Sequence, residues 1–153
     1  MRLECRTLLA APVERVRSEL SRPALLNQIA APMLTFVPVH PAWFPAHWKP
    51  GTTYRTRLML GGRLSLGEHR LQPQADLVDP VVWRDVGGSD LIPLWQHEIL
   101  LEEVHGMTRY TDRVEIHGGL LTGPAWLFAK VFYSHRQRQL NRLVARGFAS
   151  IAP

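Results

Sequence analysis

The sequence predicts an α+β protein in which a curved antiparallel sheet wraps around a long C-terminal helix. Two observations favour this fold class. Residues 53–117 alternate between apolar and polar side chains and are broken by glycine and proline turns, which is typical of successive antiparallel strands. After Gly118 and Gly119 the apolar period changes from two to about three and a half, which predicts one long helix.

The N-terminal part of the chain supplies the first elements. Residues 2–10 are predicted to form the first strand. Two short helices follow, VERVRSEL after Pro12 and then PALLNQIA, because proline is tolerated where a helix begins and apolar residues recur at helical spacing. Pro32 should end the second helix.

The middle of the chain is predicted to be β-structure. Phe36-Val37 is a short strand among prolines, which argue against a long central one. TYRTRLML and RLSLGEHRLQ flank a glycine turn as a hairpin, and VVWRDV follows a second turn at Asp79-Pro80. No repeat, low-complexity tract or linker divides the sequence. Residues 1–153 are therefore predicted to be a single domain.

The stretch WQHEILLEEVHGMTRYTDRVEIH, residues 95–117, predicts its own register. If the turn lies at His105-Gly106, strict pairing runs back from it. The charged residues then meet in two opposite pairs on one face, Glu102 with Arg109 and Glu98 with Arg113. Each such pair stabilises a sheet by roughly 0.2–1 kcal/mol, so this face is predicted to face solvent.

The other face of this hairpin is apolar and aromatic except at two positions. It consists of Trp95, His97, Ile99, Leu101, Tyr110, Asp112, Val114 and Ile116. His97 and Asp112 are diagonal neighbours at roughly 7–8 Å between Cα atoms, a gap that their side chains can close directly or through one water. Because a buried unpaired carboxylate is costly, Asp112 needs a partner, and His97 and Tyr110 are the nearest candidates.

The C-terminal helix is predicted to run towards Arg146, with Gly147 as its C-cap. Projected at about 100° per residue, one arc is apolar first and basic last. It contains Leu120, Leu121, Pro124, Phe128, Val131, Phe132, His135, Arg138, Arg142 and Arg146. We expect the apolar part to face the sheet, so that a cavity between helix and sheet would be positively charged at its far end.

The formal net charge is +5, and nearly all of the basic residues are arginines. They are scattered along the chain, which favours a solvated basic surface. No aromatic residues for base stacking are interleaved with Arg138, Arg142 and Arg146, so no nucleic-acid partner is expected. A solvated helix end and a site for an anionic head group both remain open for this stripe.

Cysteine content and hydropathy predict a soluble, cytoplasmic protein without a transmembrane segment. The single Cys5 cannot form an intramolecular disulfide, which fits a reducing compartment. MRLECRTLLAAP carries two charged residues where a signal peptide needs an apolar run. The most apolar helical stretch, residues 120–133, is too short for a membrane span and contains Lys130. The oligomeric state is not predicted.

The order of elements and three motifs resemble the START-like helix-grip superfamily, also called SRPBCC, of polyketide cyclases, lipid-transfer domains and related ligand carriers. The specific resemblance is to a bacterial subgroup and covers essentially the whole chain. LLNQIAAP matches its early leucine-rich segment ending in proline, WQHEI its W-x-H-x-apolar strand, and TRYTDRV its T-x-x-x-D-x-V strand. The matching positions are Trp95, His97, Thr108, Asp112 and Val114.

The resemblance implies a helix-grip fold of about seven antiparallel strands around the helix, with an internal cavity for an apolar or amphipathic small molecule. No cofactor is expected. The subgroup often carries a second histidine two residues after the first, where this chain has Ile99. This departure argues against a metal or two-histidine site, and the histidines show no other metal-ligand spacing.

Three functions are compatible with these residues. The first is a carrier or sensor of a lipid- or polyketide-like small molecule. The second is a cyclase- or dehydratase-type enzyme in which His97 and Asp112 act as an acid/base pair, with Tyr110 or an arginine polarising a carbonyl. The third is an interaction protein whose cavity is filled by its own side chains.

The predicted ligand contacts come from the inner face of the hairpin, the helix arc and the Pro-rich loop. They are Trp95, Ile99, Leu101, Tyr110, Val114, Phe128, Val131, Phe132, His135, Trp43 and Trp48. Large aromatic residues in the loop suit a lid over a cavity, although packing onto the sheet edge is an equal alternative.

Overall fold

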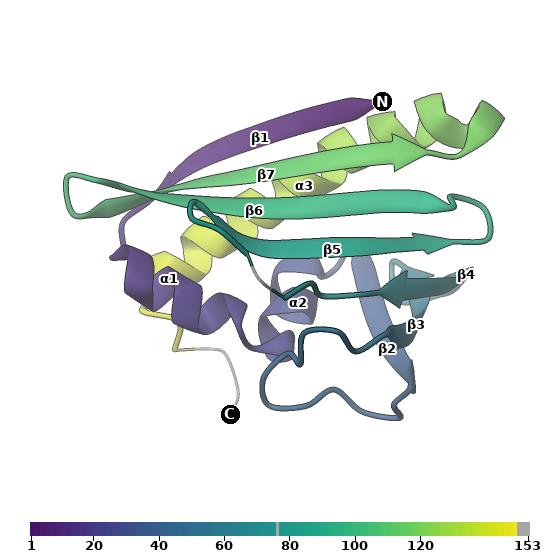
Figure 1. Cartoon of the computed structure of the whole chain (residues 1–153), viewed down its shortest axis with the longest axis horizontal. Helices are drawn as coiled ribbons and strands as arrows, with labels where there is room; N and C mark the ends of the chain where they lie inside the picture. The colour runs from purple at the N-terminus through teal and green to yellow at the C-terminus, as the bar shows by residue number, and fades with distance from the viewer. Residues whose placement is uncertain (76, 150–153) are drawn as a thin grey trace.

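The computed structural model describes residues 1–75 and 77–149, and within them seven strands form one antiparallel sheet (Figure 1). The strands are β1 (Arg2–Leu9), β2 (Leu34–His40), β3 (Tyr54–Leu60), β4 (Leu64–Leu71), β5 (Val81–Ser89), β6 (Leu94–Val104) and β7 (Met107–His117). Their order is β1-β7-β6-β5-β4-β3-β2, so β1 and β2 are the two edges. The helices α1 (Val13–Leu20) and α2 (Pro23–Ala30) carry the chain from one edge to the other.

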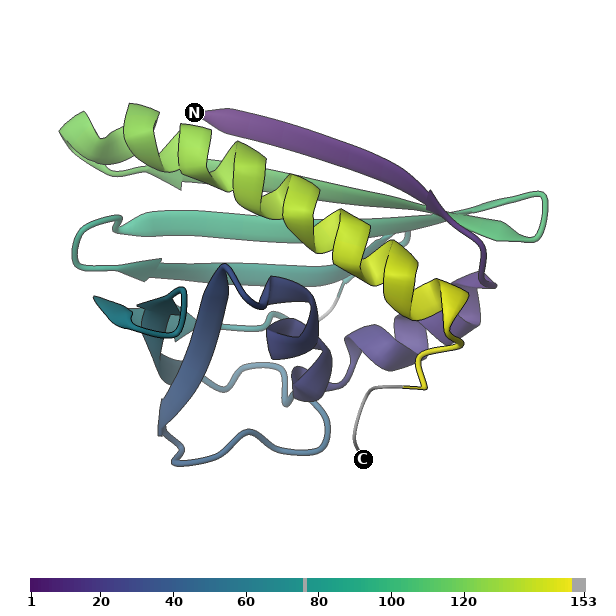
Figure 2. The same ribbon diagram turned by 180° about the vertical axis from the view of Figure 1, so that it is seen from behind.

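The long helix α3 (Thr122–Ala145) follows a short 3-10 turn, η1 (Gly119–Leu121), and crosses one face of the sheet diagonally (Figure 2). It contacts β1, β7 and α2. Gly147 follows the helix with a φ of 60°, the left-handed conformation that glycine adopts readily at a helix end. The predicted α+β fold class, a curved antiparallel sheet around a long C-terminal helix, is therefore confirmed.

The inward face of α3 differs from the predicted arc. Leu120 and Leu121 lie in η1 and are exposed, and Val131 is 53% exposed on the outer side of the helix. The buried residues of α3 are Ala129, Phe132, Tyr133, Arg136, Gln137, Leu140, Leu143 and Val144. The inward face is thus rotated by about one residue from the predicted arc. That arc was drawn through apolar residues, whereas the observed inward face also contains two polar side chains, Arg136 and Gln137.

The C-terminal arginine stripe lies outside the core. Arg138, Arg142 and Arg146 are all exposed. The predicted positive end of the cavity is therefore not built by these residues. The one arginine of α3 that is buried, within the described residues, is Arg136.

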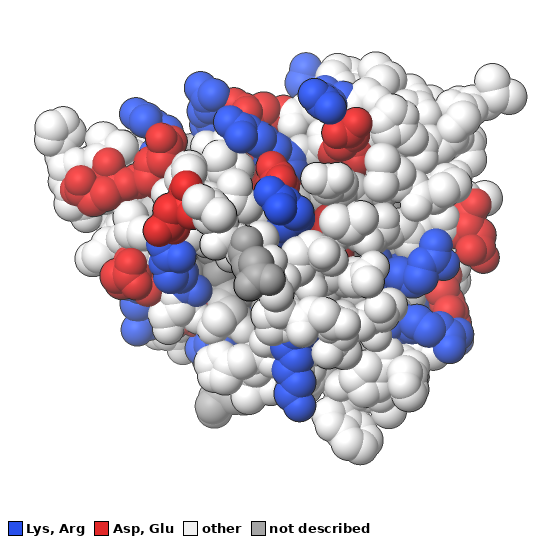
Figure 3. All heavy atoms as spheres, in the orientation of Figure 1, with Lys and Arg blue, Asp and Glu red and all other residues white. Residues whose placement is uncertain are grey.

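The predicted register of the hairpin is confirmed pair by pair, from Val104 opposite Met107 to Trp95 opposite Ile116. Of the two predicted charge pairs, Glu102 and Arg109 lie 3.8 Å apart, whereas Glu98 and Arg113 face each other in register but pair with residues of the neighbouring strands. Arg113 donates to Glu4 of β1 at 2.8 Å, and Arg84 of β5 donates to Glu98 at 2.7 Å. Acidic and basic side chains accordingly lie side by side on this outer face (Figure 3).

The helix α3 is also hydrogen-bonded to the main chain of the edge strand β1. Trp126 donates from Nε1 to the carbonyl oxygen of Arg2, and Gln137 donates from Nε2 to that of Cys5, both at 2.9 Å. The helix is therefore fastened to the edge strand by hydrogen bonds as well as by apolar packing.

Two apolar clusters make up the core. One joins α1, α2 and the C-terminal half of α3 to β6 and β7, through residues such as Val16, Leu25, Ile99 and Leu140. The other joins the first half of α3 to the strands around Tyr54 and Ile116. None of the helices in the described ranges combines the length and apolar character that a membrane span requires.

Candidate ligand-binding cavity

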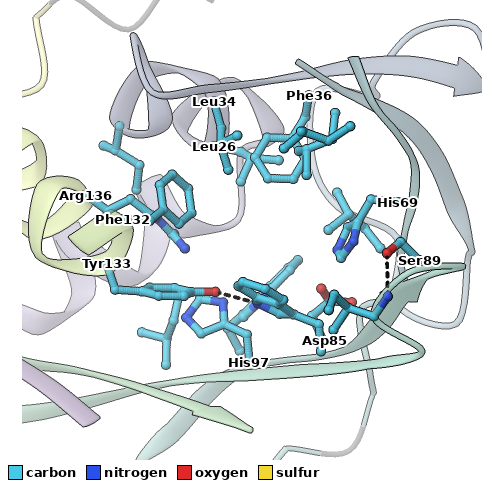
Figure 4. A pocket seen from close by; sticks show the side chains of 18 of the residues that line it. Leu26, Leu34, Phe36, His69, Asp85, Ser89, His97, Phe132, Tyr133 and Arg136 are labelled. Atoms are coloured by element: carbon cyan, nitrogen blue, oxygen red, sulfur yellow. Dashed lines mark hydrogen bonds between the residues drawn. The ribbon is translucent and has the colours of Figure 1, made fainter. Parts of the chain in front are cut away.

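A cavity of about 240 Å³ lies between the sheet and α3. It corresponds to roughly eight water molecules at about 30 Å³ each, so the interior is not filled by the chain's own side chains. Its wall is mainly apolar and includes Leu25, Leu26, Ile29, Leu34, Phe36, Trp48, Leu58, Leu66, Leu71, Trp83, Trp95, Ile99, Phe128 and Phe132. Figure 4 shows side chains from α3 and from the strands converging on this space.

The structure brings part of the predicted ligand set to the cavity wall, namely Trp48, Trp95, Ile99, Phe128 and Phe132, together with His97. Three others, Leu101, Tyr110 and Val114, are buried in the core clusters and do not line the cavity. Ligand binding by the lining residues remains a prediction.

The remaining predicted contacts lie away from the cavity. Val131 faces solvent because the inward face of α3 is rotated, and His135 places Nε2 at 2.8 Å from the carbonyl oxygen of Ala31. That contact ties α3 to the end of α2. Trp43 is 76% exposed, whereas Phe44 and Trp48 of the same loop pack around Tyr54.

Asp112 is fully buried and accepts three hydrogen bonds. His97 Nε2 lies at 2.7 Å from Oδ1, the hydroxyl of Tyr110 donates to the same oxygen at 3.2 Å, and Gln137 donates to Oδ2 at 2.9 Å. The sequence predicted the first two partners. Burial alone raises the pKa of Asp112, but the hydrogen bond from His97 and the other donors outweigh it and leave the pKa below its ordinary value.

His97 stands between this carboxylate and the cavity. Burial lowers the pKa of His97, and the bond to Asp112 offsets this effect only in part. The ring is therefore neutral near neutral pH, with its proton on Nε2 towards Asp112 and its lone pair on Nδ1. The imidazole also packs on the ring of Tyr133, with centroids 4.9 Å apart.

Two buried titratable residues of the cavity were not predicted from the sequence. Asp85 lies directly across from His97 in the β5–β6 ladder, and burial raises its pKa to about 7. His69 on β4 is also buried in the wall, and burial lowers its pKa to about 4. Asp85 accepts a hydrogen bond from the backbone N–H of Gln72. A carboxyl group with this pKa exchanges its proton near neutral pH, which suits acid/base chemistry.

The third unpredicted residue is Arg136, which is only 6% exposed and lines the cavity. Its guanidinium packs over the rings of Phe132 and Tyr133, at 5.8 Å and 5.1 Å from their centroids. The Nε atom is buried without a hydrogen-bond partner, and within the described residues no carboxylate forms an ion pair with the group. Asp112 favours this charge electrostatically, but a buried charge without an ion-pair partner in contact is costly, so this arrangement needs an explanation.

No protein-family model matches the sequence, and no curated protein matches it either. Solved structures do match it. Ms6760 from Mycobacterium smegmatis superposes with a TM-score of 0.71 at 16% identity, over 95% of this chain and 92% of that one. NE0264 from Nitrosomonas europaea gives a TM-score of 0.67 at 18% identity, over 97% of both chains. Ara h 8.0201 gives 0.58 at 11% identity, over 92% of this chain and 97% of that one.

The chain has a helix-grip fold. Its seven-stranded antiparallel sheet, two short helices and long C-terminal helix superpose on these structures over nearly the whole length of each chain. At these identities the likeness shows the helix-grip fold alone, and a function has to be argued from this chain's own residues.

A metal site is not supported by the residues of this helix-grip domain. Across positions 1–75 and 77–149, no group of three or more His, Cys, Asp or Glu side chains is placed to hold a metal ion. The polar groups of the cavity are instead set apart from one another. Figure 4 shows Arg136 and Tyr133 on the α3 side, across the cavity from His69 and Ser89.

Proposed function

We propose that this domain is a START-like carrier or sensor that binds an apolar or amphipathic small molecule in the cavity between the sheet and α3. The cavity itself carries the proposal, since it is apolar over most of its wall and holds a few convergent polar groups. Its open volume counts against the alternative of an interaction protein with a filled interior.

The volume favours a small ligand. At about 240 Å³ the cavity lies below the usual range of roughly 300–1,000 Å³ for ligand sites. It has room for a molecule of about ten non-hydrogen atoms, such as an eight-carbon chain with a polar end or a small aromatic compound. A diacyl lipid would need the walls to move apart.

The first test is binding itself. Trp48, Trp83 and Trp95 line the cavity, so a ligand that enters it should change the tryptophan fluorescence in a saturable way. We expect such a response to at least one member of a panel of six- to twelve-carbon alcohols, acids and ketones and small aromatics. Native mass spectrometry should show one ligand per chain. No response to any panel member, together with no co-purified molecule, would contradict the proposal.

A matched pair of variants places the binding site. Ala125 lines the cavity from α3, whereas Ala24 is an exposed residue of α2. Ala125→Leu should weaken ligand binding by about ten-fold or more because the added carbons occupy ligand volume, and Ala24→Leu should leave it unchanged. Equal affinities of the two variants would place binding outside the cavity.

A second candidate function is favoured by the position of His97, which lines the cavity while Asp112 lies behind it. We propose as the alternative a cyclase- or dehydratase-type enzyme in which Nδ1 of His97 removes a proton from a carbon next to a carbonyl. Asp112 would orient the ring and stabilise the imidazolium that forms.

This alternative is testable without knowing the natural substrate. In D₂O the α-protons of 2-nonanone, whose size suits the cavity, should exchange faster with the protein than in buffer, by about 100-fold or more if His97 is a positioned base. His97→Gln should abolish the increase, while the exposed-site variant His105→Gln should retain it. Exchange at the buffer rate, or equal exchange by both variants, would exclude the base role.

A further inference from the structure

We infer that the ligand of this cavity carries a carboxylate, which pairs with Arg136. The inference rests on the proposed ligand-binding function and specifies the class of ligand. It follows from a cation placed inside an apolar cavity without a partner of opposite charge. The apolar body of the ligand would lie along the leucine and aromatic wall, with its carboxylate at the α3 side.

The cation is built into the fold and is not a mobile surface group. Arg136 is 6% exposed, and its guanidinium is held against the rings of Phe132 and Tyr133. Its Nε hydrogen is buried and makes no hydrogen bond. Since arginine stays protonated at any pH that the protein meets, the charge cannot be removed by titration.

The protein's own carboxylates do not neutralise Arg136 by contact. Asp112 acts on it electrostatically, but its two oxygens are already occupied by His97, Tyr110 and Gln137. Asp85 lies on the other side of the cavity in Figure 4. Glu68, which also lines the cavity, is held by Arg55 through hydrogen bonds of 2.8–3.0 Å.

A second donor stands beside the guanidinium. The hydroxyl of Tyr133 accepts the indole N–H of Trp95 at 3.1 Å, which leaves its own proton available to donate. A planar guanidinium and one hydroxyl match the two oxygens of a carboxylate. A sulfate or phosphate ester has three terminal oxygens and would need further donors.

The test compares ligands that differ only at one end. By calorimetry at about pH 8, where a fatty acid is ionised, octanoate should bind about ten-fold or more tightly than 1-octanol. Octyl sulfate should bind more weakly than octanoate. If 1-octanol or octyl sulfate binds as tightly as octanoate, the carboxylate assignment is wrong while the cavity proposal stands. If none of the three binds, and no other panel member does, both proposals fail.

Variants of α3 locate the charge. Arg136→Met should lower octanoate affinity by about ten- to 100-fold and leave 1-octanol binding unchanged or stronger, because it keeps the unbranched stem without the charge. Arg138→Met, at an exposed position of the same helix, should change neither. An equal loss of both ligands in Arg136→Met would overturn the ion pair.

A third variant covers the case in which Arg136→Met does not fold. Arg136→Lys keeps the charge but not the planar fork, so it should retain a preference for octanoate over 1-octanol with reduced octanoate affinity. Loss of the preference in Arg136→Lys, with 1-octanol binding intact, would count against the inference.

Discussion

Replacing Asp112 by alanine is expected to lower the free energy of unfolding by about 3–5 kcal/mol. Its carboxylate is fully buried and accepts hydrogen bonds from His97, Tyr110 and Gln137. Without it, the buried donors of His97 and Tyr110 lose their partner, and the strands and α3 lose the group that joins them. Urea denaturation followed by circular dichroism measures the loss.

The control for this prediction is a carboxylate on the outer face of the same sheet. Glu4 of β1 pairs with Arg113 of β7, and both side chains are partly exposed. Glu4→Ala should therefore cost less than about 1 kcal/mol. If Asp112→Ala costs no more than Glu4→Ala, the buried carboxylate does not hold the core together.

Replacing Asp85 by asparagine is expected to make the protein more stable at neutral pH and to remove part of its pH dependence. Burial raises the pKa of Asp85 to about 7 in the folded state, from an ordinary value of 3.8. Between these values the folded chain binds one proton more than the unfolded chain, so stability falls as the pH rises from about 4 to about 7. The loss is on the order of 4 kcal/mol, at about 1.4 kcal/mol per pH unit.

The wild-type stability curve alone would conceal this effect, because His69 acts in the opposite direction. Burial lowers its pKa from 6.5 to about 4, so the unfolded chain binds the extra proton between these values and stability rises with pH there. The measured quantity is therefore the difference between Asp85→Asn and the wild-type protein in urea denaturation, at several pH values from about 4 to 8.

That difference should grow in favour of the variant up to about pH 7 and level off above it. The exposed Asp90, in the loop after β5, provides the control for removing one carboxylate. A difference for Asp85→Asn that stays constant over this range would show that Asp85 is not buried as a neutral acid.

The fold was predictable because its strongest signals are local. The hairpin of residues 95–117 has a turn and opposite charges that agree on one register, and that register is observed at every pair. The contact between His97 and Asp112 follows from it directly. The long helix was predictable from its change of period, and its end from Gly147.

The cavity was less predictable because its polar residues look like surface residues in a sequence. Asp85 alternates in phase with Trp83 on the inner face of β5, but a carboxylate is usually exposed and was not expected in a cavity wall. Arg136 is buried just outside the apolar arc that was predicted for α3. The helical projection likewise placed Val131 on the inward face of α3 and so predicted the wrong inward face. The β5–β6 register places Asp85 beside His97 and Arg84 opposite Glu98, but the connection at residues 90–93 has no two-residue turn from which that register could be counted.

The hydrogen bond from Trp126 of α3 to the main chain of β1 protects this edge of the sheet from self-association. An edge strand offers unpaired carbonyl groups to any other extended chain, which can add to it and start aggregation. Here the carbonyl oxygen of Arg2, which points away from β7, is occupied by the indole N–H of Trp126 from α3. The helix that forms part of the cavity wall therefore also blocks strand addition at this edge. Detachment of α3 would expose the cavity and the edge of β1 together.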